Sequence, residues 1–550
     1  MIDLHVHSLR SDGTMTPTEL VDYAIEKGLS AMALTDHDTV AGISEAIGYA
    51  GKLKEEGITV PEIIPGIELS TDYYGQDVHI VGLYIDYTNP DFEDYLADFV
   101  NSREIRNVKV CKMLTDAGMP VDYDELRQKN EGAVITRAHF AAYLLEKGFV
   151  KSKKEAFDRY IGDGRPFHIP REKINPIDAV KMILKAKGIP VLAHPILYGF
   201  GKDKLDTLVA SLKEEGLMGI EAVYSTYTLA DERQIRKLAN KYHLLLSGGS
   251  DFHGTNKDGI DLAVGKGKLY VDDSLLDAIK ASHKKVLFTD MDGTLLLNDS
   301  TVSPAMQSAL KTATDNGHRV VLTSGRPLDS ILEVKDKFGL NFKNMWIIAN
   351  NGSVIYNCDK KEYIFKKKLP IDIVLKVMEL CEEAGIHAHV YTDKDIVGTV
   401  EDEELAFYRS KIHLPFILTD DLRKTIPDGS FKVEIIALND YPALVELRKV
   451  IEAKLGDVVD AVFSNTMYLE ILPKGISKGN ALLTLEKYLP VAHYNTYASG
   501  DAPNDLSMIE AAGVGVAMAN AQQCVKDIAD IVTKEDNDHN GLIEIIRSFD

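Results

Sequence analysis

The sequence predicts an α/β protein made of two domains, and three observations lead to this prediction. The chain has 550 residues, more than the ~100–200 residues typical of one domain. Short apolar stretches alternate with amphipathic helical stretches along most of it, a pattern typical of βα units and largely parallel sheets. At residue 284, the segment KKVLFTDMDGT begins with an apolar strand that runs into an acidic pair, which is typical of the first strand of another α/β domain. We therefore place a domain boundary near residue 283.

The first domain, residues 1–283, opens with a predicted strand at residues 2–6, a helix at about 17–28 and a strand ending at Asp36. Further predicted strands are EIIPGIEL, VHIVGLYI, IPVLAHP, GIEAVYS and HLLLSGGSD. Polar motifs fall at or near the ends of these strands, which is the rim where a parallel barrel places its active site. Residues from about 91 to 186 interrupt the alternation of strands and helices with predicted helices rich in Lys and Arg. We expect an insertion lying over the barrel mouth.

The second domain, residues 284–550, repeats the strand–helix alternation. Residues from about 368 to 472 interrupt it with the strand-like pieces IHAHVYT, FKVEIIAL, AVFSN and YLEILP, separated by helical stretches. This segment is predicted to be a separate α/β unit inserted into the second core.

Composition excludes several classes of protein. Hydrophobic residues make up 45% and charged residues 27% of the chain, which is typical of soluble globular proteins. No apolar run approaches the ~18 residues of a membrane helix, and the first residues carry no signal-peptide pattern. The four cysteines lie far apart without CxxC spacing, so we expect a reducing cytoplasm. The net charge of -22 disfavours stable binding to duplex nucleic acid or anionic membranes.

Histidines and carboxylates gather at the strand ends of the first domain. His5 and His7 share one face of a strand, because side chains alternate along it. Imidazole and carboxylate are the usual ligands of Zn, Mn and Fe. One such histidine is more often structural, but so many strand ends with the same residue types predict a metal site. The candidates are His5, His7, Asp12, His37, Glu68, His79, His194, Asp251 and His253. They suffice for three ions if Glu68 bridges two.

The motifs HVHSLRSDG, TDHDT, GIELS, AHP and GSDFHG together resemble the PHP (polymerase and histidinol phosphatase) family over residues 1 to about 283. Within it, the sequence is most similar to bacterial phosphatases acting on AMP and nucleoside 3′,5′-bisphosphates, and to relatives that trim RNA from the 5′ end. The resemblance implies a distorted (β/α)7 barrel that holds three metal ions. The first ion would be bound by His5, His7, Glu68 and Asp251, the second by Glu68, His79 and His194, and the third by Asp12, His37 and His253.

The chemistry implied for this site is phosphomonoester hydrolysis. A water bridging two metal ions loses a proton near neutral pH and becomes a nucleophile. In TRAHF, Arg137 and His139 resemble the substrate-binding pair of the family. Arginine can grip a second phosphate with two parallel hydrogen bonds, although a surface ion pair explains Arg137 equally well. The residues leave the metals open among Mn, Fe and Zn, and they do not identify the general acid.

Four motifs in the second domain carry phosphate chemistry. An apolar strand runs into Asp290 and Asp292, and VVLTSGRP places Thr323 and Ser324 at another strand end. Lys478 precedes a helix, where its ammonium group could neutralise phosphate charge. Finally, GDAPND supplies Asp501, Asn504 and Asp505, oxygen ligands of the kind that Mg²⁺ prefers.

This ordered series resembles the haloacid dehalogenase-like hydrolases, and most closely their Cof-type phosphatases, over residues 284–550. The resemblance implies a Rossmann-like core with an inserted α/β cap, which closes over the site and selects the substrate. Asp290 would be the nucleophile that becomes an aspartyl-phosphate, and Asp292 the general acid and base. Thr323 and Lys478 would hold the phosphate. Mg²⁺ would be bound by Asp290, the backbone carbonyl of Asp292 and Asp501, with Asp505 in support.

The sequence therefore predicts a fusion of two metal-dependent phosphatases with different mechanisms. The first would act on AMP, a nucleoside 3′,5′-bisphosphate or a short oligonucleotide 5′ end, and the second on a small phosphorylated metabolite such as a sugar phosphate. One alternative is a histidinol-phosphate-type phosphatase for the first domain. Another is that one domain is a non-catalytic binding or regulatory module.

Overall fold

The computed structural model describes residues 1–162, 164–169, 174–412 and 414–549. The described part leaves out residues 163 and 170–173 of the predicted insertion, residue 413 of the predicted cap and residue 550 at the end of the second domain. The chain divides into two compact units, Met1–Lys280 and Ala281–Asp550. No helix in the described part is long and apolar enough to span a lipid bilayer.

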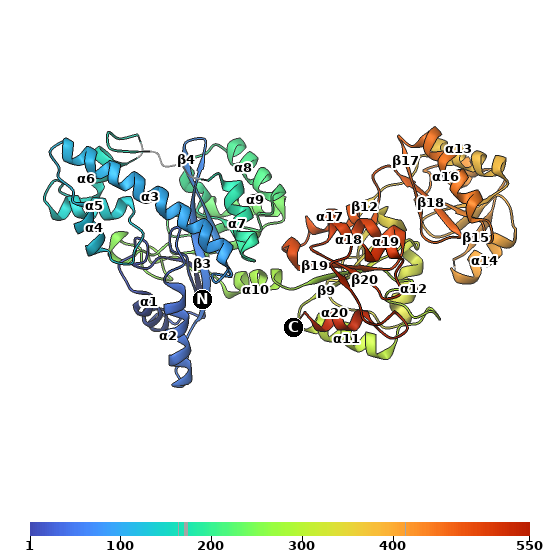
Figure 1. Ribbon diagram of the computed structural model, residues 1–550, viewed down its shortest axis with the longest axis horizontal. Coiled ribbons are helices and arrows are strands. Elements are labelled where there is room, and N and C mark those ends of the chain that lie inside the picture. The colour runs from blue at the N-terminus through green and yellow to red at the C-terminus, as the bar shows by residue number, and fades with distance from the viewer. Residues whose placement is uncertain (163, 170–173, 413, 550) are drawn as a thin grey trace. The chain divides into compact units, whose positions relative to one another are not determined.

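Seven strands of the first unit form one sheet in the order β1 to β7, of which Figure 1 labels β3 and β4. They are β1 (Ile2–Val6), β2 (Ala31–Leu34), β3 (Glu62–Tyr73), β4 (Gln76–Leu83), β5 (Ile189–Leu192), β6 (Gly219–Tyr224) and β7 (Leu245–Gly249). The backbone just after β7 pairs with β1, because Asp251 N–H donates to the His5 carbonyl at 2.9 Å and His7 N–H donates to the Phe252 carbonyl at 3.0 Å. The sheet thus nearly closes, which confirms the predicted barrel-like fold.

One strand runs against the others. β4 is antiparallel to both β3 and β5, while the remaining neighbours are parallel. β3 and β4 are joined by Tyr74 and Gly75, both with positive φ, and so tight a turn can only connect antiparallel strands. The reversal brings the first half of β4, with His79, to the rim where the parallel strands end.

Helices bury their apolar faces around this barrel. These are α1 (Pro17–Glu26), α2 (Ile43–Glu55), α7 (Pro176–Lys185), α8 (Lys202–Glu214) and α9 (Leu229–Tyr242). The start of α1 is fixed by a capping box in which Thr16 and Glu19 exchange side-chain-to-backbone hydrogen bonds, satisfying two otherwise free backbone donors. Leu20, Ile183 and Leu208 belong to the resulting core.

The predicted insertion is helical and has an apolar core of its own. It contains α3 (Pro90–Asp116), α4 (Tyr123–Lys129), α5 (Arg137–Glu146) and α6 (Lys153–Ala156). Leu114, Leu126, Phe140 and Leu144 pack together inside it. Because this core is separate from that of the barrel, the insertion is a distinct lobe whose helices present polar residues to the barrel rim. Helix α10 (Asp273–Ser282) contains the division between the two units.

The second unit is built on an eight-stranded sheet in the order β12-β11-β10-β9-β8-β19-β20-β21. The six strands from β10 to β21 are parallel, and β11 and β12 add an antiparallel edge. The strands are β8 (Val286–Thr289), β9 (Arg319–Thr323), β10 (Trp346–Ala349), β11 (Val354–Asn357), β12 (Glu362–Lys366), β19 (Thr496–Gly500), β20 (Val514–Ala517) and β21 (Ile531–Val532).

Helices cover both faces of this sheet, which confirms the Rossmann-like core. One apolar cluster joins the sheet to α11 (Pro304–Asp315), α12 (Leu328–Lys337) and α20 (Leu542–Arg547). A second cluster joins the other face to α17 (Lys478–Glu486) and α18 (Leu506–Ala511). Short helix α19 (Gln523–Lys526) precedes β21.

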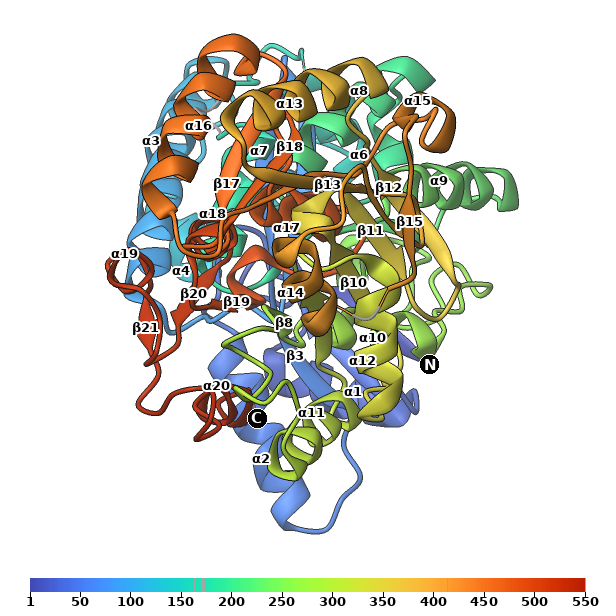
Figure 2. The ribbon, with the colours of Figure 1, turned by 90° about the vertical axis from the view of Figure 1, so that its right-hand side faces the viewer.

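The inserted segment forms a six-stranded sheet in the order β15-β14-β13-β16-β18-β17. Its strands are β13 (His387–Tyr391), β14 (Ile396–Gly398), β15 (Phe416–Leu418), β16 (Val433–Ile436), β17 (Val459–Phe463) and β18 (Tyr468–Pro473). Helices α13 (Ile371–Ala384) and α16 (Tyr441–Leu455) lie along one face of it (Figure 2). Helices α14 (Glu403–Lys411) and α15 (Leu422–Thr425) complete the segment. Val433, Ile435 and Leu469 face α13 and α16, so the residues between them face the other way.

Candidate functional sites

The nine predicted ligands of the first unit come together at the rim of the barrel. His5 projects from β1, Glu68 from β3 and His79 from β4, while His7 comes directly after β1 and the others follow strand ends. Their donor atoms form overlapping groups within 4.8 Å of one another. The groups are His7, Asp12, His37 and His253; His5, His7 and Asp251; His5, Glu68 and His194; and His37, Glu68 and His79.

Glu68 lies at the centre of these groups and is buried. Its Oε2 atom lies 3.2 Å from Nε2 of both His5 and His7. Its Oε1 atom lies 2.9 Å from His79 Nδ1 and from His194 Nε2. Oε2 also lies 3.1 Å from His37 Nδ1. One carboxylate thus faces three imidazoles with Oε2 and two with Oε1, which is the geometry that a bridging ligand needs.

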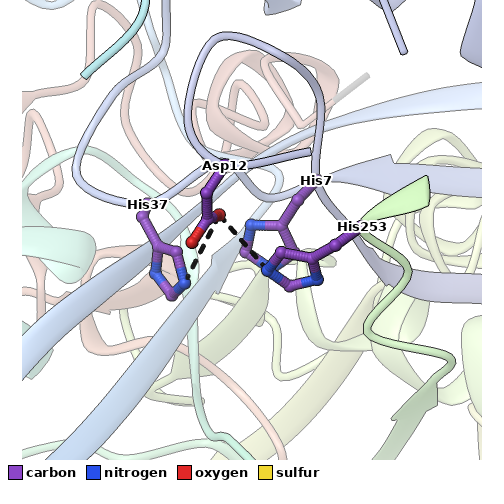
Figure 3. A group of neighbouring side chains, drawn as sticks. All are labelled: His7, Asp12, His37 and His253. Atoms are coloured by element: carbon purple, nitrogen blue, oxygen red, sulfur yellow. Dashed lines mark ion pairs between the residues drawn. The ribbon is translucent and has the colours of Figure 1, made fainter. Parts of the chain in front are cut away.

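Asp12 organises the opposite side of the cluster (Figure 3). Its Oδ1 atom lies 3.2 Å from His253 Nε2 and 3.9 Å from His37 Nε2. The ring of His7 stacks on that of His253 with centroids 4.1 Å apart. The set predicted for a third ion is therefore assembled, with His7 added to it.

The donor atoms at this centre fit divalent metal ions. Within the described part of the chain, His5 Nε2, His7 Nε2, Asp12 Oδ1 and His37 Nδ1 are buried beside other ligand atoms but make no hydrogen bond of good geometry. That state is costly for polar groups unless something binds them. Burial lowers the pKa of His7, and it lowers the pKa of His37 to about 3. These imidazoles are neutral at physiological pH, as metal ligation requires.

Three residues that the sequence did not single out hold the ligands in place. Glu221 on β6 is 2% exposed; it contacts His5 Nδ1 at 3.1 Å and accepts the backbone N–H of His194 at 2.7 Å. The Tyr224 hydroxyl donates to Asp251 Oδ2 at 2.6 Å, and Lys257 also contacts that oxygen. Such partners fix the rotamer and tautomer of metal ligands. A lone Glu in a strand gives no sequence pattern that reveals this role.

Arginines of the insertion border the cluster. A cavity of about 300 Å³ is lined by Asp12, His37 and His79 together with Arg103, Arg106 and Arg137. The Nη2 atom of Arg137 lies 3.2 Å from Asp77 Oδ2, whereas Arg103 is tied to Asp38 and Ser70.

His139, the other residue predicted to bind substrate, performs a helix-capping role. Its Nδ1 accepts the Thr136 backbone N–H at 2.9 Å at the start of α5. The ring is buried and is not among the residues lining the cavity. Arg137 is therefore the better placed of the predicted pair for contact with substrate.

The predicted residues of the second unit converge at the carboxyl ends of β8 and β19. Lys478, fully buried at the start of α17, donates to Asp290 Oδ1 at 2.5 Å and to Asp505 Oδ1 at 2.6 Å. Donor oxygens of Asp290, Asp501 and Asp505 lie within 4.8 Å of one another. Burial and the Asp505 carboxylate raise the pKa of Asp501 to about 7. Such crowding of carboxylates fits a hard, oxygen-bound cation such as Mg²⁺.

The other predicted residues surround this group. Arg326 holds Asp292 through two hydrogen bonds, Nε to Oδ2 at 2.7 Å and Nη2 to Oδ1 at 2.5 Å. Thr323 is fully buried, and its hydroxyl has no partner among the described residues, as expected of a group that awaits a phosphate oxygen. Ser324 Oγ accepts the Arg326 N–H at 3.2 Å. Asn504 donates to Asn351 Oδ1 at 3.2 Å.

A cavity of about 430 Å³ lies between this candidate catalytic group and the cap. Its lining includes Asp290, Asp292, Ser324 and Asn504 on the core side and Lys432, Glu434 and Glu470 on the cap side. A volume of this size is typical of small-molecule sites. The cavity thus has room for a small substrate between Asp290 and the cap.

Fold and sites together define a phosphoester hydrolase built from two α/β units, each with a candidate metal site. Residues 3–161 match the PHP domain family, and residues 287–546 match the haloacid dehalogenase-like hydrolases. A 5′-3′ exoribonuclease of Haemophilus influenzae is 38% identical over 270 residues, which is 48% of this chain and 96% of that protein. A 3′,5′-nucleoside bisphosphate phosphatase of Chromobacterium violaceum is 34% identical over 48% of this chain and 90% of its own.

Relatives of the second half are similarly covered. The protein YxeH of Bacillus subtilis is 31% identical over 46% of this chain and 94% of its own length. A haloacid dehalogenase-like hydrolase of known structure from Bacteroides thetaiotaomicron is 29% identical, with a TM-score of 0.45, over 48% of this chain and 100% of its own. The chain belongs to the PHP family in its N-terminal half and to the haloacid dehalogenase-like hydrolases in its C-terminal half, and it is an enzyme that hydrolyses phosphoester bonds.

Proposed function

We propose that the chain is a bifunctional phosphatase. The PHP half hydrolyses a nucleotide phosphomonoester, namely AMP, a nucleoside 3′,5′-bisphosphate or a short oligonucleotide 5′ end. The second half removes phosphate from a small metabolite. The observation that carries the first part is the cavity in which Arg103, Arg106 and Arg137 border the metal-ligand cluster. The names of the relatives, an exoribonuclease and a bisphosphate phosphatase, agree with such a substrate.

In the PHP half, the protein's part is to bind and orient. Three divalent ions, Mn, Fe or Zn, would be held by the nine clustered ligands and would supply Lewis acidity and a nucleophilic water. Glu221 holds the ring of His5 and the backbone of His194, so the ligands need no rearrangement. The guanidinium of Arg137 can hold a second phosphate with paired hydrogen bonds. That contact aligns the scissile phosphate with the cluster.

In the second half, covalent catalysis is carried by the protein itself. A Mg²⁺ held by Asp290, the Asp292 carbonyl, Asp501 and Asp505 would neutralise phosphate charge. A carboxylate oxygen of Asp290 attacks phosphorus while the leaving oxygen takes a proton from Asp292, giving an aspartyl-phosphate. Asp292 then takes a proton from water, which attacks phosphorus and frees Asp290. Lys478 keeps Asp290 in place through their 2.5 Å hydrogen bond, and the Thr323 hydroxyl binds the transferred phosphate.

The substrate assignment of the PHP half is tested with Arg137→Met. Loss of a charge-assisted contact costs about 1.5–3 kcal/mol, so kcat/KM for adenosine 3′,5′-bisphosphate should fall by about 10- to 100-fold, with a smaller fall for AMP. Arg159→Met is the control, since Arg159 is an exposed residue of the same lobe paired with Glu155. An equal loss on both nucleotides, or faster hydrolysis of histidinol phosphate than of either, would contradict the proposal.

The two-site assignment is tested by silencing each half in the full chain. His5→Ala/His7→Ala should abolish nucleotide hydrolysis and spare hydrolysis of p-nitrophenyl phosphate by the other half. Asp290→Asn should do the reverse. If Asp290→Asn removes every activity, the PHP half is not an independent phosphatase.

A further inference from the structure

The cap side of the second cavity carries a buried trio of charges, Lys432, Glu434 and Glu470. Glu434 on β16 and Glu470 on β18 are direct cross-strand partners, and like charges in that position repel each other. Lys432 Nζ lies between them and donates to Glu434 Oε2 at 2.5 Å and to Glu470 Oε2 at 2.7 Å. All three side chains are at most 3% exposed. The trio therefore forms one hydrogen-bonded unit, in which burial raises the pKa of Glu434 to about 7.

Stability alone does not account for this trio. Burying three charges carries a large desolvation cost, and apolar residues of similar size are often equally or more stabilising. The neighbours on the same strands, such as Val433 and Ile471, are apolar. The trio instead occupies the face of the cap sheet that lines the cavity, opposite Asp290 and Asp292.

Each carboxylate of the trio keeps one oxygen free for a ligand. The Oε2 atoms accept from Lys432, and they also accept from Tyr391 in the case of Glu434 and from Asn351 in the case of Glu470. The two Oε1 atoms make no hydrogen bond to any described residue, and neither is among the buried atoms lacking a partner. Because both glutamates line the cavity, these Oε1 atoms are the acceptors of the trio that remain for a ligand.

The cationic groups that line this cavity are already engaged or lie at its mouth. Arg326 is held by both oxygens of Asp292, and Lys432 is held by two glutamates. Lys411, the remaining basic residue of the described lining, is exposed. A second phosphate pressed against the cap would meet two carboxylate oxygens, and the cations beside them, Lys432 and Arg326, are already paired with carboxylates.

From this geometry we propose that the trio selects the leaving group of the second active site. The preferred leaving group donates hydrogen bonds, through hydroxyl or ammonium groups, to the Oε1 atoms of Glu434 and Glu470, and it carries no second anionic group. This inference rests on the proposed phosphatase function of the second half and narrows its substrates. Phosphorylated polyols and amino sugars fit, whereas bisphosphates and nucleotides do not.

The test uses the full chain with the PHP site silenced by His5→Ala/His7→Ala. The probes are glucose 6-phosphate, glucosamine 6-phosphate, glucose 1,6-bisphosphate and p-nitrophenyl phosphate, the last of which offers no hydroxyl donors. We expect kcat/KM for either monophosphate to exceed that for the bisphosphate by at least about 10-fold, the value of one charge-assisted hydrogen bond. The two monophosphates distinguish hydroxyl from ammonium donors.

Glu434→Gln and Glu470→Gln keep the side-chain shape and remove one negative charge. Each variant should lose about 10-fold in kcat/KM for the preferred monophosphate, measured relative to kcat/KM for p-nitrophenyl phosphate. Each should also show a smaller difference in kcat/KM between that monophosphate and the bisphosphate. Glu446→Gln is the control, since Glu446 is an exposed cap residue paired with Lys449. Circular dichroism and thermal melting verify the fold.

The outcomes separate this inference from the function on which it rests. If the parent protein hydrolyses none of the probes, the proposed phosphatase function fails. If it hydrolyses p-nitrophenyl phosphate but prefers the bisphosphate, or if both glutamine variants keep the parent's substrate ratios, the selection by the trio is refuted. If one glutamine variant does not fold, the other variant and the substrate preference of the parent protein decide the question.

Discussion

Glu221 offers a sharp test of how the PHP site is held together. The residue binds no predicted metal ion itself, yet it contacts two predicted ligands, the ring of His5 at 3.1 Å and the backbone N–H of His194 at 2.7 Å. It is 2% exposed, so no water can replace these contacts freely. Replacing Glu221 should therefore act through the orientation of the ligands.

The expected size of the effect follows from the two contacts. Glu221→Gln keeps one acceptor oxygen and loses the charge, so one of the two hydrogen bonds is lost or weakened, at a cost of about 1.5–3 kcal/mol. This corresponds to about 10- to 100-fold in metal affinity or activity. Glu221→Ala loses both contacts and leaves a cavity behind His5, so its effect should be larger.

The assay is equilibrium dialysis against Mn²⁺ with elemental analysis, followed by AMP hydrolysis at saturating metal. Glu221→Gln should retain fewer ions at low Mn²⁺ and regain activity as Mn²⁺ rises. The control is Glu215→Gln, in which an exposed ion pair with Lys181 is removed from the same unit. If Glu221→Gln binds metal and hydrolyses AMP as the parent does, the claim that this residue positions the ligands is wrong.

Three further predictions concern the second unit. Lys478→Met leaves Asp290 and Asp505 buried without their shared cation, so we expect a loss of about 3–5 kcal/mol in stability, measured by urea unfolding, together with loss of p-nitrophenyl phosphate hydrolysis. Gly293 has φ +82°, and a Cβ there would lie 2.5 Å from Asp501 Oδ2. Gly293→Ala should therefore weaken activation by Mg²⁺ at least about 10-fold. The control Gly339→Ala, at a glycine with open space around it, should leave activation by Mg²⁺ unchanged. Burial lowers the pKa of His283 from 6.5 to about 4, so its neutral form contributes stability above pH 6.5 that is lost as the pH falls towards 4. The loss amounts to about 3 kcal/mol, and urea unfolding of His283→Gln should lack this component.

Residues carried by strand-end motifs were predictable, because their surroundings follow from the fold class alone. A parallel strand delivers whatever follows it to one rim, so HVH, GIELS and DMDGT could be placed before any register was known. The hairpin that reverses β4 was not predicted, yet His79 still reaches the rim, because it lies in the first half of a strand that enters from that side.

Roles that depend on register or on single contacts were not predictable. Glu221 stands in GIEAVYS, where its alternation with apolar residues is equally typical of a solvent-facing strand residue. Glu434 and Glu470 become partners only through the pairing of β16 with β18, and the two strands lie far apart in sequence. His139 belongs to a motif of the family, but its Nδ1 is used to cap α5, a role that depends on the precise start of that helix.

The two sites differ in donor chemistry, and this difference makes their activities separable by metal. Six of the nine predicted ligands clustered in the PHP half are imidazoles, which suit Mn, Fe and Zn better than Mg²⁺. The group in the second half consists of the carboxylates Asp290, Asp501 and Asp505, a set of oxygen donors suited to Mg²⁺. Metal-free protein given Mg²⁺ alone should therefore regain p-nitrophenyl phosphate hydrolysis that depends on Asp290, but it should not regain AMP hydrolysis.

Adding Mn²⁺ at micromolar concentration should then restore AMP hydrolysis, and His5→Ala/His7→Ala should block this second step only. Both sites experience the same chelation and the same buffer. The order in which the two activities recover therefore reflects the donor atoms that line each site. Full recovery of AMP hydrolysis with Mg²⁺ alone would mean that the imidazole cluster does not set the metal preference of the PHP half. Recovery of both activities by Mn²⁺ alone would be compatible with the donor sets, since carboxylates also bind Mn²⁺. The Mg²⁺ step is therefore the discriminating one.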